Sequence, residues 1–436
     1  MATIKPFRAI RYNENAVTMR DVVTPPYDVI DDDYQSILYN ESPHNFIRID
    51  LNKINDTDTD DNNRYTRARG YLFDWMAKGI MKLDEEPGVY RHIQTFKDET
   101  GTTITRKGFF ALIKLAEYDE NIVLPHERTL RGPKIDRLDL MKATGTHLSP
   151  VFFLYDDPTS DIDHKLDRTQ STKIVDVTTD DGIHHQLWKI TEYDAIAEMQ
   201  EQLNDQQVLI ADGHHRYETA LAYRDYRREC AEENLEDAAY EYALGFFCNF
   251  RDPGLAVYGT HRVVHGLDTF DWSTVISTIE TAEHFKMEAL TTDASEKAIR
   301  DALESAGAEH PSFVLMANGQ SPRVVSFVGT NDTPIFDEAT PNEVRELDVA
   351  VLHEGIFDRV LGISKEAQEA KTNLKYIKGF SDAVQSVSDT NHQMVVLMNA
   401  TKVEQVDSVC KSGGKMPQKS TFFYPKVLSG LLLNPA

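Results

Sequence analysis

Hydrophobic and polar positions follow two patterns along the chain, and each predicts a different element. Short apolar runs that stop at turn residues predict buried strands. They lie at residues 89–96, 104–115, 151–155, 187–190, 208–211, 313–316, 324–328 and 394–398, with strand ends at 8–11 and 22–23. Apolar residues three or four positions apart predict helices. They lie at residues 65–78, 196–203, 344–362 and 403–412. We therefore predict an α+β fold with a mixed sheet.

Turn and capping residues place several boundaries between these elements. Residues 98–101 and Asn318-Gly319 supply turns between paired strands, and residues 56–63 form a polar surface loop. The sequence Thr340-Pro341-Asn342-Glu343 has the form of a capping box with proline at the first helical position. It predicts one helix that runs from there to Gly362.

The length and a change of pattern indicate two domains. A chain of 436 residues is long enough for two or three domains of ordinary size. After residues 261–263 the pattern changes to alternating helices and strands, with a weak linker around Gly266. We predict an N-terminal domain over residues 1–265, with a β-rich insertion, and a C-terminal α/β domain over residues 266–436.

Composition narrows the classes of partner. The net charge is −25, which argues against a protein that coats nucleic acid or an anionic membrane surface. The three cysteines are far apart and the N-terminus lacks an apolar signal core, so we expect neither a disulfide framework nor a secretory signal. We expect a cytoplasmic protein that binds small molecules. A homodimer is the oligomeric state that we consider for it.

The sequence V-L-I-A-D-G-H-H-R-Y, at residues 208–217, carries the strongest candidate site. A buried strand stops at Asp212, and a helical pattern follows at once. Backbone N–H groups at a helix start favour an anion, and Gly213 lets a ligand approach the backbone closely. Arg216 suits bidentate binding of phosphate. The pattern predicts a phosphate or nucleotide site; the plainer interpretation is a turn in which Asp212 caps the helix.

The two histidines of this turn, His214 and His215, raise the alternative of a metal site. Neighbouring residues at a helix start diverge by roughly 100°, so joint ligation of one ion is awkward. A magnesium ion that arrives with nucleotide phosphates and is held by Asp212 or Glu127 is the interpretation that we favour.

A second candidate site covers residues 126–142, a basic cluster in an acidic chain. Arg131, Lys134 and Arg137 are its candidate phosphate ligands, and Lys134 and Arg137 should share a helix face. Glu127 lies just before them, and a carboxylate beside a phosphate site can serve as a general base. The alternative is a surface ion pair between Glu127 and Arg128 or Arg131.

Two further segments hold candidate ligand contacts. Lys415, Lys419 and Ser420 surround a glycine pair, but the spacing does not match a Walker A loop, and a helix C-cap with a loop is the alternative. Tyr27 and Asp28 follow two stiff prolines, which suits a rigid substrate pocket. A structural turn with Asp28 as a helix cap is the alternative there.

The D-G-H-H-R sequence after a strand resembles the signature of a prokaryotic family catalogued as domain of unknown function 1015. The segments T-P-P-Y-D-V (residues 24–29), L-P-H-E-R-T (124–129) and M-P-Q-K-S-T-F-F-Y-P-K (416–426) resemble its other blocks, in the same order. The family is similar, more distantly, to the ParB/sulfiredoxin/free-serine-kinase superfamily, in which a G-x-H-R type of turn holds nucleotide phosphates at a helix start. This resemblance implies a ParB/sulfiredoxin-like catalytic domain at the N-terminus.

Residues and resemblance together lead to the hypothesis of a small-molecule kinase. ATP or ADP with Mg²⁺ would bind at Gly213 to Arg216, Asp212 would hold magnesium or position the acceptor, and His214 or His215 would donate hydrogen bonds to phosphoryl oxygens. The resemblance implies a glutamate base, for which Glu127 is our candidate, and free serine as the acceptor. The alternatives are a nucleotide hydrolase and a nucleotide-sensing regulator.

Overall fold

The computed structural model describes residues 1–127, 131–231, 235–417 and 419–436. The chain divides into two compact units. The first, here called the N-terminal unit, comprises Met1–Pro125, Thr129–Leu255 and Pro425–Ala436; the second, the C-terminal unit, comprises His126–Arg128 and Ala256–Tyr424. These units are defined by contacts, and the domain boundary expected after residue 265 stays a prediction.

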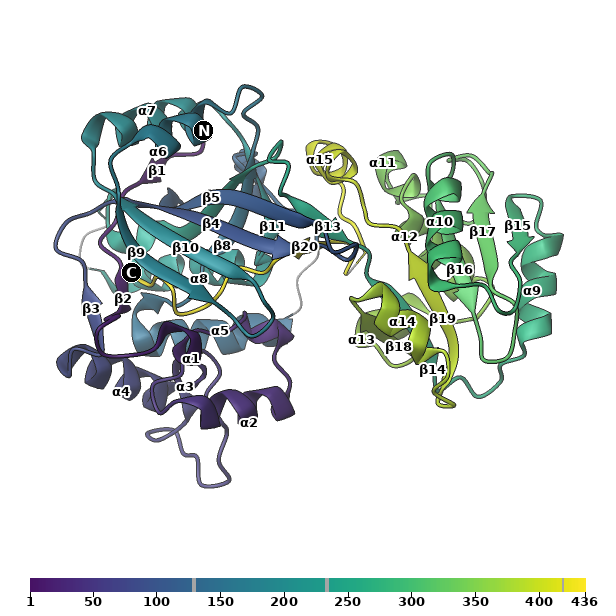
Figure 1. Cartoon of the computed structure of the whole chain (residues 1–436), viewed down its shortest axis with the longest axis horizontal. Coiled ribbons are helices and arrows are strands. Elements are labelled where there is room, and N and C mark those ends of the chain that lie inside the picture. Colours follow the sequence, from purple (N-terminus) through teal and green to yellow (C-terminus); the bar gives the residue numbers. More distant parts are fainter. Residues whose placement is uncertain (128–130, 232–234, 418) are drawn as a thin grey trace. The chain divides into compact units, whose positions relative to one another are not determined.

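A mixed sheet forms the centre of the N-terminal unit (Figure 1). Among the described residues its order is β6-β11-β8-β12-β5-β4-β10-β9, and β1 pairs with β5. The pairs β6–β11 and β8–β12 are parallel and the others are antiparallel, which confirms the predicted mixed sheet. The strands are β1 (Ile4–Lys5), β4 (Val89–Lys97), β5 (Thr103–Lys114), β6 (Val123–Leu124), β8 (Val151–Tyr155), β9 (Thr172–Thr178), β10 (His184–Ile190), β11 (Val208–Asp212) and β12 (Tyr242–Asn249).

Helices and short strands complete the N-terminal unit. The helices are α1 (Met19–Val22), η1 (Tyr27–Val29), α2 (Asp32–Glu41), α3 (Ile47–Asp50), α4 (Arg64–Ala77), η2 (Tyr118–Glu120), α5 (Arg131–Thr144), α6 (Asp161–Arg168), α7 (Tyr193–Asn204), α8 (His214–Cys230) and η3 (Ala239–Glu241). The small pairs are β2 (Ile10–Tyr12) with β3 (Met81–Leu83), and β7 (Thr146–His147) with β21 (Asn434–Pro435). In the described parts of the chain, no helix combines the length and the apolar composition needed to cross a bilayer.

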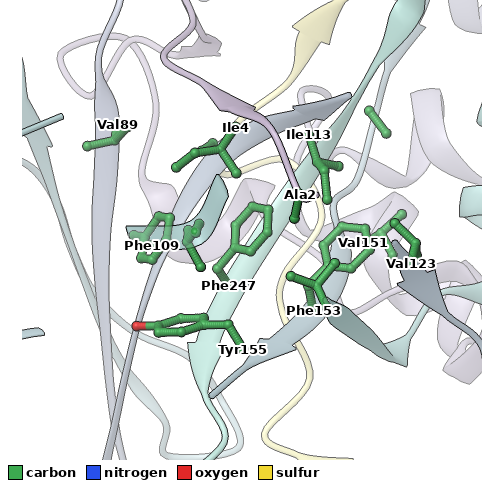
Figure 2. Packing of buried hydrophobic residues seen from close by; sticks show 14 of the residues in the cluster. Ala2, Ile4, Val89, Phe109, Ile113, Val123, Val151, Phe153, Tyr155 and Phe247 are labelled. Atoms are coloured by element: carbon green, nitrogen blue, oxygen red, sulfur yellow. The ribbon is translucent and has the colours of Figure 1, made fainter. Parts of the chain in front are cut away.

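The main core of this unit lies against one face of the sheet. Phe247 on β12 stacks on Phe109 of β5 and Phe153 of β8, with both pairs of ring centroids 5.2 Å apart (Figure 2). The apolar faces of α6, α7 and α8 join the same cluster. Tyr217 of α8 is fully buried there, and its hydroxyl donates a hydrogen bond of 2.8 Å to the carbonyl of Ala116. The first turn of α8 is therefore fixed to the core.

The C-terminal unit contains a second sheet, of order β15-β17-β16-β19-β14-β18, in which every pair is antiparallel. Apolar residues of α10 and α14 pack on it. Its strands are β13 (Ala256–Tyr258), β14 (His261–His265), β15 (Phe285–Ala289), β16 (Ser312–Met316), β17 (Arg323–Phe327), β18 (Leu374–Ile377), β19 (His392–Met398) and β20 (Phe422–Tyr424), of which β13 pairs with β20. Its helices are α9 (Trp272–Thr281), α10 (Glu296–Gly307), α11 (Asn342–Arg345), α12 (Asp348–Ala350), the π-helix η4 (Val351–Asp358), α13 (Lys365–Ala370), α14 (Phe380–Ser386) and α15 (Val403–Lys411).

Two local predictions are wrong. Val22, predicted as a strand end, is the last residue of helix α1. The single helix predicted up to Gly362 is divided into α11, α12 and η4, and its N-cap residue is Pro341, with no side-chain cap. Thr340 does not cap it, because the Thr340 hydroxyl donates instead to Glu354 of η4, at 3.0 Å. A tertiary hydrogen bond thus replaces the local one that the motif suggested.

Candidate functional site

The turn between β11 and α8 has an unusual backbone. Gly213 is the N-cap residue of α8 and has φ +96°, in the left-handed region that favours glycine. A Cβ at this position would lie 2.9 Å from the guanidinium carbon of Arg216. The N-cap residue is therefore Gly213 and not Asp212, which was the plainer interpretation of this turn. The turn therefore presents the start of a 17-residue helix, where N–H groups lack intrahelical partners, at the end of a buried strand.

The carboxylate of Asp212 lies between two cations of the same unit. Its Oδ2 accepts from Arg216, four residues along α8, and its Oδ1 accepts from Lys426. Arg216 also donates to the carbonyl oxygen of Pro150. Two cations thus lie beside the start of α8, and Pro150 and Asp212 together hold the Arg216 guanidinium in one orientation. Both features favour an anionic ligand.

A buried arginine holds the segment that carries Lys426. Arg106 on β5 is fully buried, and its guanidinium donates to Oε1 of Gln94, with Nε at 3.1 Å, and to the carbonyl of Pro425 at 2.6 Å. Gln94 in turn donates to the carbonyl of Lys426 at 3.3 Å. Burial lowers the pKa of Arg106 to about 10, so it still carries its charge at neutral pH. Arg106 therefore adds positive charge near Asp212 and positions the backbone of Lys426.

The predicted basic helix, α5, packs along α8, and two of its cations, Lys134 and Arg137, form ion pairs. Lys134 reaches Glu218 of α8 at 2.7 Å. Arg137 is buried, and Nη1 lies 3.0 Å from Oδ1 of Asp50, a carboxylate that is itself 2 % exposed. Burial raises the pKa of Asp50, and Arg137 opposes that shift. The side chain of Arg131 lies outside the described part of the structure.

Tyr27 and Asp28 belong to the same neighbourhood as α5. The guanidinium of Arg137 lies over the ring of Tyr27, 4.1 Å from its centroid. Burial raises the pKa of Tyr27 to about 12, which keeps the phenol neutral. Asp28 is exposed, and the cap of the next helix is Asp31, which accepts from the amide of Tyr34 at 2.8 Å. Asp28 is therefore available for a role other than capping.

The histidines of the turn differ in exposure. His214 is buried, at 5 % exposed, whereas His215 is half-buried. Among the described residues, no three histidine, cysteine, aspartate or glutamate side chains gather in the way that a metal ion requires. The assignment of magnesium to Asp212 stays a prediction, and the two cations that occupy the Asp212 carboxylate weigh against it.

The other predicted site residues belong to the C-terminal unit. Glu127 forms a parallel β-bridge with Met416. Lys415, next to Met416, is exposed and lines a cavity. The carbonyl of Lys419 accepts from Arg262 at 3.0 Å, and the buried Ser420 hydroxyl donates to the carbonyl of Pro417 at 2.5 Å. Ion pairs of Glu127 with Arg128 or Arg131 involve groups outside the described residues.

Sequence analysis did not propose Lys426, Arg106 or Asp50 as site residues. Lys426 is 214 positions away from Asp212, and only the tertiary fold brings the two together. For two of these three residues, the sequence contains a feature that could have drawn attention to them. Lys426 is the last residue of the segment 416–426 that resembles a block of the family, and Arg106 is a charge inside the predicted strand 104–115. A charged residue in a buried strand needs partners, which is a reason to look for a site there.

The comparison with protein families matches residues 4–350 to the family described as "Protein of unknown function (DUF1015)". The match covers most of the chain, so the chain belongs to this family. A comparison with curated proteins finds no match.

The solved structures that match this protein share little sequence with it. A conserved hypothetical protein from Pyrococcus furiosus is 17 % identical and has a TM-score of 0.35, covering 72 % of this chain and 90 % of its own. A free serine kinase in complex with AMP is 14 % identical, with a TM-score of 0.37 and coverage of 72 % and 86 %. C-terminally truncated SbnI from Staphylococcus aureus is 10 % identical, with a TM-score of 0.34 and coverage of 74 % and 86 %.

Proposed function

We propose that this member of the DUF1015 family is a nucleotide-dependent phosphotransferase that binds nucleotide phosphates at the start of α8. The observation that carries the proposal is the turn at Gly213, where a helix start coincides with Arg216 and Lys426 on either side of Asp212. Helix N-termini and arginine forks are two common means of binding phosphate in proteins. Here they occur in one turn of one unit.

Preorganisation strengthens the case for a phosphate ligand. Arg216 is already held by Asp212 and Pro150, so it loses little rotamer freedom when an anion binds. An arginine has five N–H donors, so the contacts of Arg216 with Asp212 and Pro150 do not use all of them. Its guanidinium can therefore bind phosphoryl oxygens while it keeps Asp212 in place.

Phosphoryl transfer is the reaction that this type of site serves best. Catalysis of this transfer consists mainly of positioning and of stabilising charge on the phosphoryl oxygens, which fixed cations provide. The acceptor is a small hydroxyl compound in our proposal, with free serine as the first candidate, and Tyr27 and Asp28 as contacts for it. Magnesium would shield the phosphate charges when it enters with the nucleotide. The role of Glu127 as general base stays a prediction.

The test has two stages. Calorimetric titration with ADP and with ATP, each with and without Mg²⁺, should show binding of at least one of them. A screen of amino acids and small polyols, with the phosphorylated product detected by mass spectrometry, should then identify an acceptor. Nucleotide breakdown without an acceptor would replace the kinase by a hydrolase, and tight binding without turnover would indicate a sensor. If no nucleotide binds, the proposal is wrong.

A further inference from the structure

The C-terminal unit contains a cavity of about 550 Å³, a size typical of small-molecule sites. All of its lining residues belong to this unit, and none of them belongs to the turn at Gly213. Val344, Met416 and neighbouring prolines give the cavity apolar surface. The π-helix η4 lines it with His353 and Glu354, and π-helical turns are rare and often occur at functional sites. The cavity is therefore a candidate site of its own.

Two charged side chains of helix α13, Lys365 and Glu369, line the cavity, and both residues are exposed. They are four positions apart, so they are neighbours on one face of the helix. They do not pair with each other, because Lys365 donates to Asp337 and lies 3.9 Å from Glu354. In the described part of the chain, Glu369 forms neither an ion pair nor a side-chain hydrogen bond. The cavity thus has a carboxylate that the described residues leave unpaired, next to an ammonium group.

The ammonium group of Lys365 keeps donors for a ligand. One N–H is used on Asp337, and Glu354 lies beyond hydrogen-bond distance. A lysine ammonium has three donors, so two of them remain. Burial lowers the pKa of Lys365, but the hydrogen bond to Asp337 and the charge of Glu354 outweigh burial and raise it. The side chain of Lys365 is 48 % exposed and is charged at neutral pH.

The hydroxyl of Tyr376, on β18, supplies a neutral donor to the same cavity. Among the described residues it has no hydrogen-bond partner, and its oxygen is not one of the atoms closed off from solvent. Burial raises the pKa of Tyr376, so the phenol keeps its proton at neutral pH. A protonated hydroxyl can donate to an oxygen of a ligand. The cavity therefore has unused capacity for a negative group, at Lys365 and Tyr376, and for a positive group, at Glu369.

We propose that this cavity binds a free amino acid with a large apolar side chain. Its carboxylate accepts from Lys365 and Tyr376, and its ammonium group pairs with Glu369. Its side chain lies against the apolar surface of Val344 and Met416.

Both charges of the amino acid are needed for this fit. A free amino acid carries them on one carbon atom, which suits two side chains that are one helical turn apart. A ligand without the ammonium group would leave Glu369 unpaired beside an added negative charge. A ligand without the carboxylate would leave the donors of Lys365 and Tyr376 unused. This site is separate from the proposed phosphate turn and does not rest on it.

The experiment removes each charge of the ligand in turn. L-phenylalanine, L-leucine and L-methionine are the probes, titrated into the full-length protein by calorimetry without nucleotide. We expect at least one of them to bind in a saturable way. Its N-acetyl derivative, which lacks the ammonium group, and its carboxamide, which lacks the carboxylate, should each bind about tenfold more weakly, the effect of one lost charge-assisted hydrogen bond. Glycine, which lacks the apolar side chain, should also bind more weakly.

Three variants locate the binding. Glu369→Gln should weaken binding of the amino acid about tenfold but leave the affinity for its N-acetyl derivative unchanged, because that derivative has no ammonium group to lose. Tyr376→Phe keeps the ring, removes the hydroxyl and should also weaken binding. Glu366→Gln is the matched control, because Glu366 is an exposed residue of the same helix that does not line the cavity. It should bind the amino acid as the parent protein does.

Three results would overturn the proposal. The first is that none of the three amino acids binds at millimolar concentration. The second is that the N-acetyl derivative and the carboxamide bind as well as the amino acid. Both results come from the unaltered protein, so they stand whether or not a variant folds. The third is that Glu369→Gln and Tyr376→Phe bind the amino acid with the parental affinity, which would place the binding outside this cavity.

Discussion

The turn at Gly213 in the N-terminal unit and the cavity in the C-terminal unit that His353 lines differ in their electrostatics. In the turn, two cations, Arg216 and Lys426, contact the carboxylate of Asp212 at a helix start. In the cavity, Glu354 and Lys365 have partners within the protein, and Val344 and Met416 add apolar surface. Cations at a helix start favour an anionic ligand, whereas a cavity of this kind favours a ligand that fits its shape. The two units are therefore expected to recognise different chemistry.

The largest expected effect concerns Glu127, the carboxylate that sequence analysis assigned as general base. If it takes the proton of the acceptor, Glu127→Gln should keep nucleotide binding and reduce turnover roughly 10²–10⁴-fold, the usual contribution of such a base. The amide is nearly isosteric, so packing should not change. Asp28→Asn is the comparison, because a substrate contact should raise KM rather than lower kcat. Parental turnover in Glu127→Gln would remove Glu127 from the mechanism.

Arg216→Ala should have the next largest effect. Loss of charge-assisted hydrogen bonds to phosphate should weaken nucleotide binding by about 1.5–3 kcal/mol, measured by calorimetry. Arg20→Ala is the matched control, because Arg20 is an exposed arginine of the same unit in an ion pair with Asp180. The Arg20→Ala variant should bind nucleotide with the same affinity as the parent protein. Equal affinity in a folded Arg216→Ala protein would contradict the phosphate assignment.

Two half-buried aspartates, one in each unit, make the stability of the units depend on pH. Burial raises the pKa of Asp252 in the N-terminal unit and of Asp348 in the C-terminal unit to about 6, from 3.8. The folded state then binds the proton more tightly than the unfolded state, so stability falls as the pH rises from about 4 to above 6. Each group should contribute about 1–3 kcal/mol to this loss.

Denaturant unfolding at pH 4.5 and pH 8 checks this linkage. Asp348→Asn should flatten the pH dependence of the C-terminal unit, and Asp252→Asn that of the N-terminal unit. If one of these variants keeps the full pH dependence of the parent protein, the aspartate that was replaced does not cause that dependence. Its pKa in the folded parent protein is then not raised.

The smallest effect is expected at Gly213. Gly213→Ala should cost about 1–2 kcal/mol of stability, because alanine is strained in the left-handed region. Gly182→Ala is a matched control, since Gly182 also has a positive φ but open space around it. Both variants should lose stability, but only Gly213→Ala should also lose nucleotide affinity, because its Cβ displaces the Arg216 guanidinium. Equal nucleotide affinity in the two variants would contradict that role.

Features that are formed by consecutive residues could be predicted from the sequence. The strand, turn and helix around Gly213 occupy consecutive residues, and periodicity and turn chemistry were sufficient to place them. The hairpin at Asn318-Gly319 and the helix that ends before Gly79 were predicted for the same reason. These elements are confirmed by the structure.

Features that depend on distant residues were missed. Lys426 reaches Asp212 only because the C-terminal segment returns to the first sheet, where Arg106 and Gln94 hold it. The helix predicted up to Gly362 is divided where Glu354 bonds to Thr340 and to the loop before it. The cavity that His353 lines in the C-terminal unit also takes its walls from distant segments, among them those of Val344, Tyr376 and Met416. No local pattern records such contacts.

The central claim is that nucleotide phosphates bind at the start of α8. A crystal structure of the full chain with bound ADP or ATP tests it most directly. We predict a phosphate group within hydrogen-bond distance of the backbone N–H groups of residues 214–216, with Arg216 and Lys426 on its oxygens. A nucleotide whose phosphates lie elsewhere, with this turn unchanged, would contradict the account.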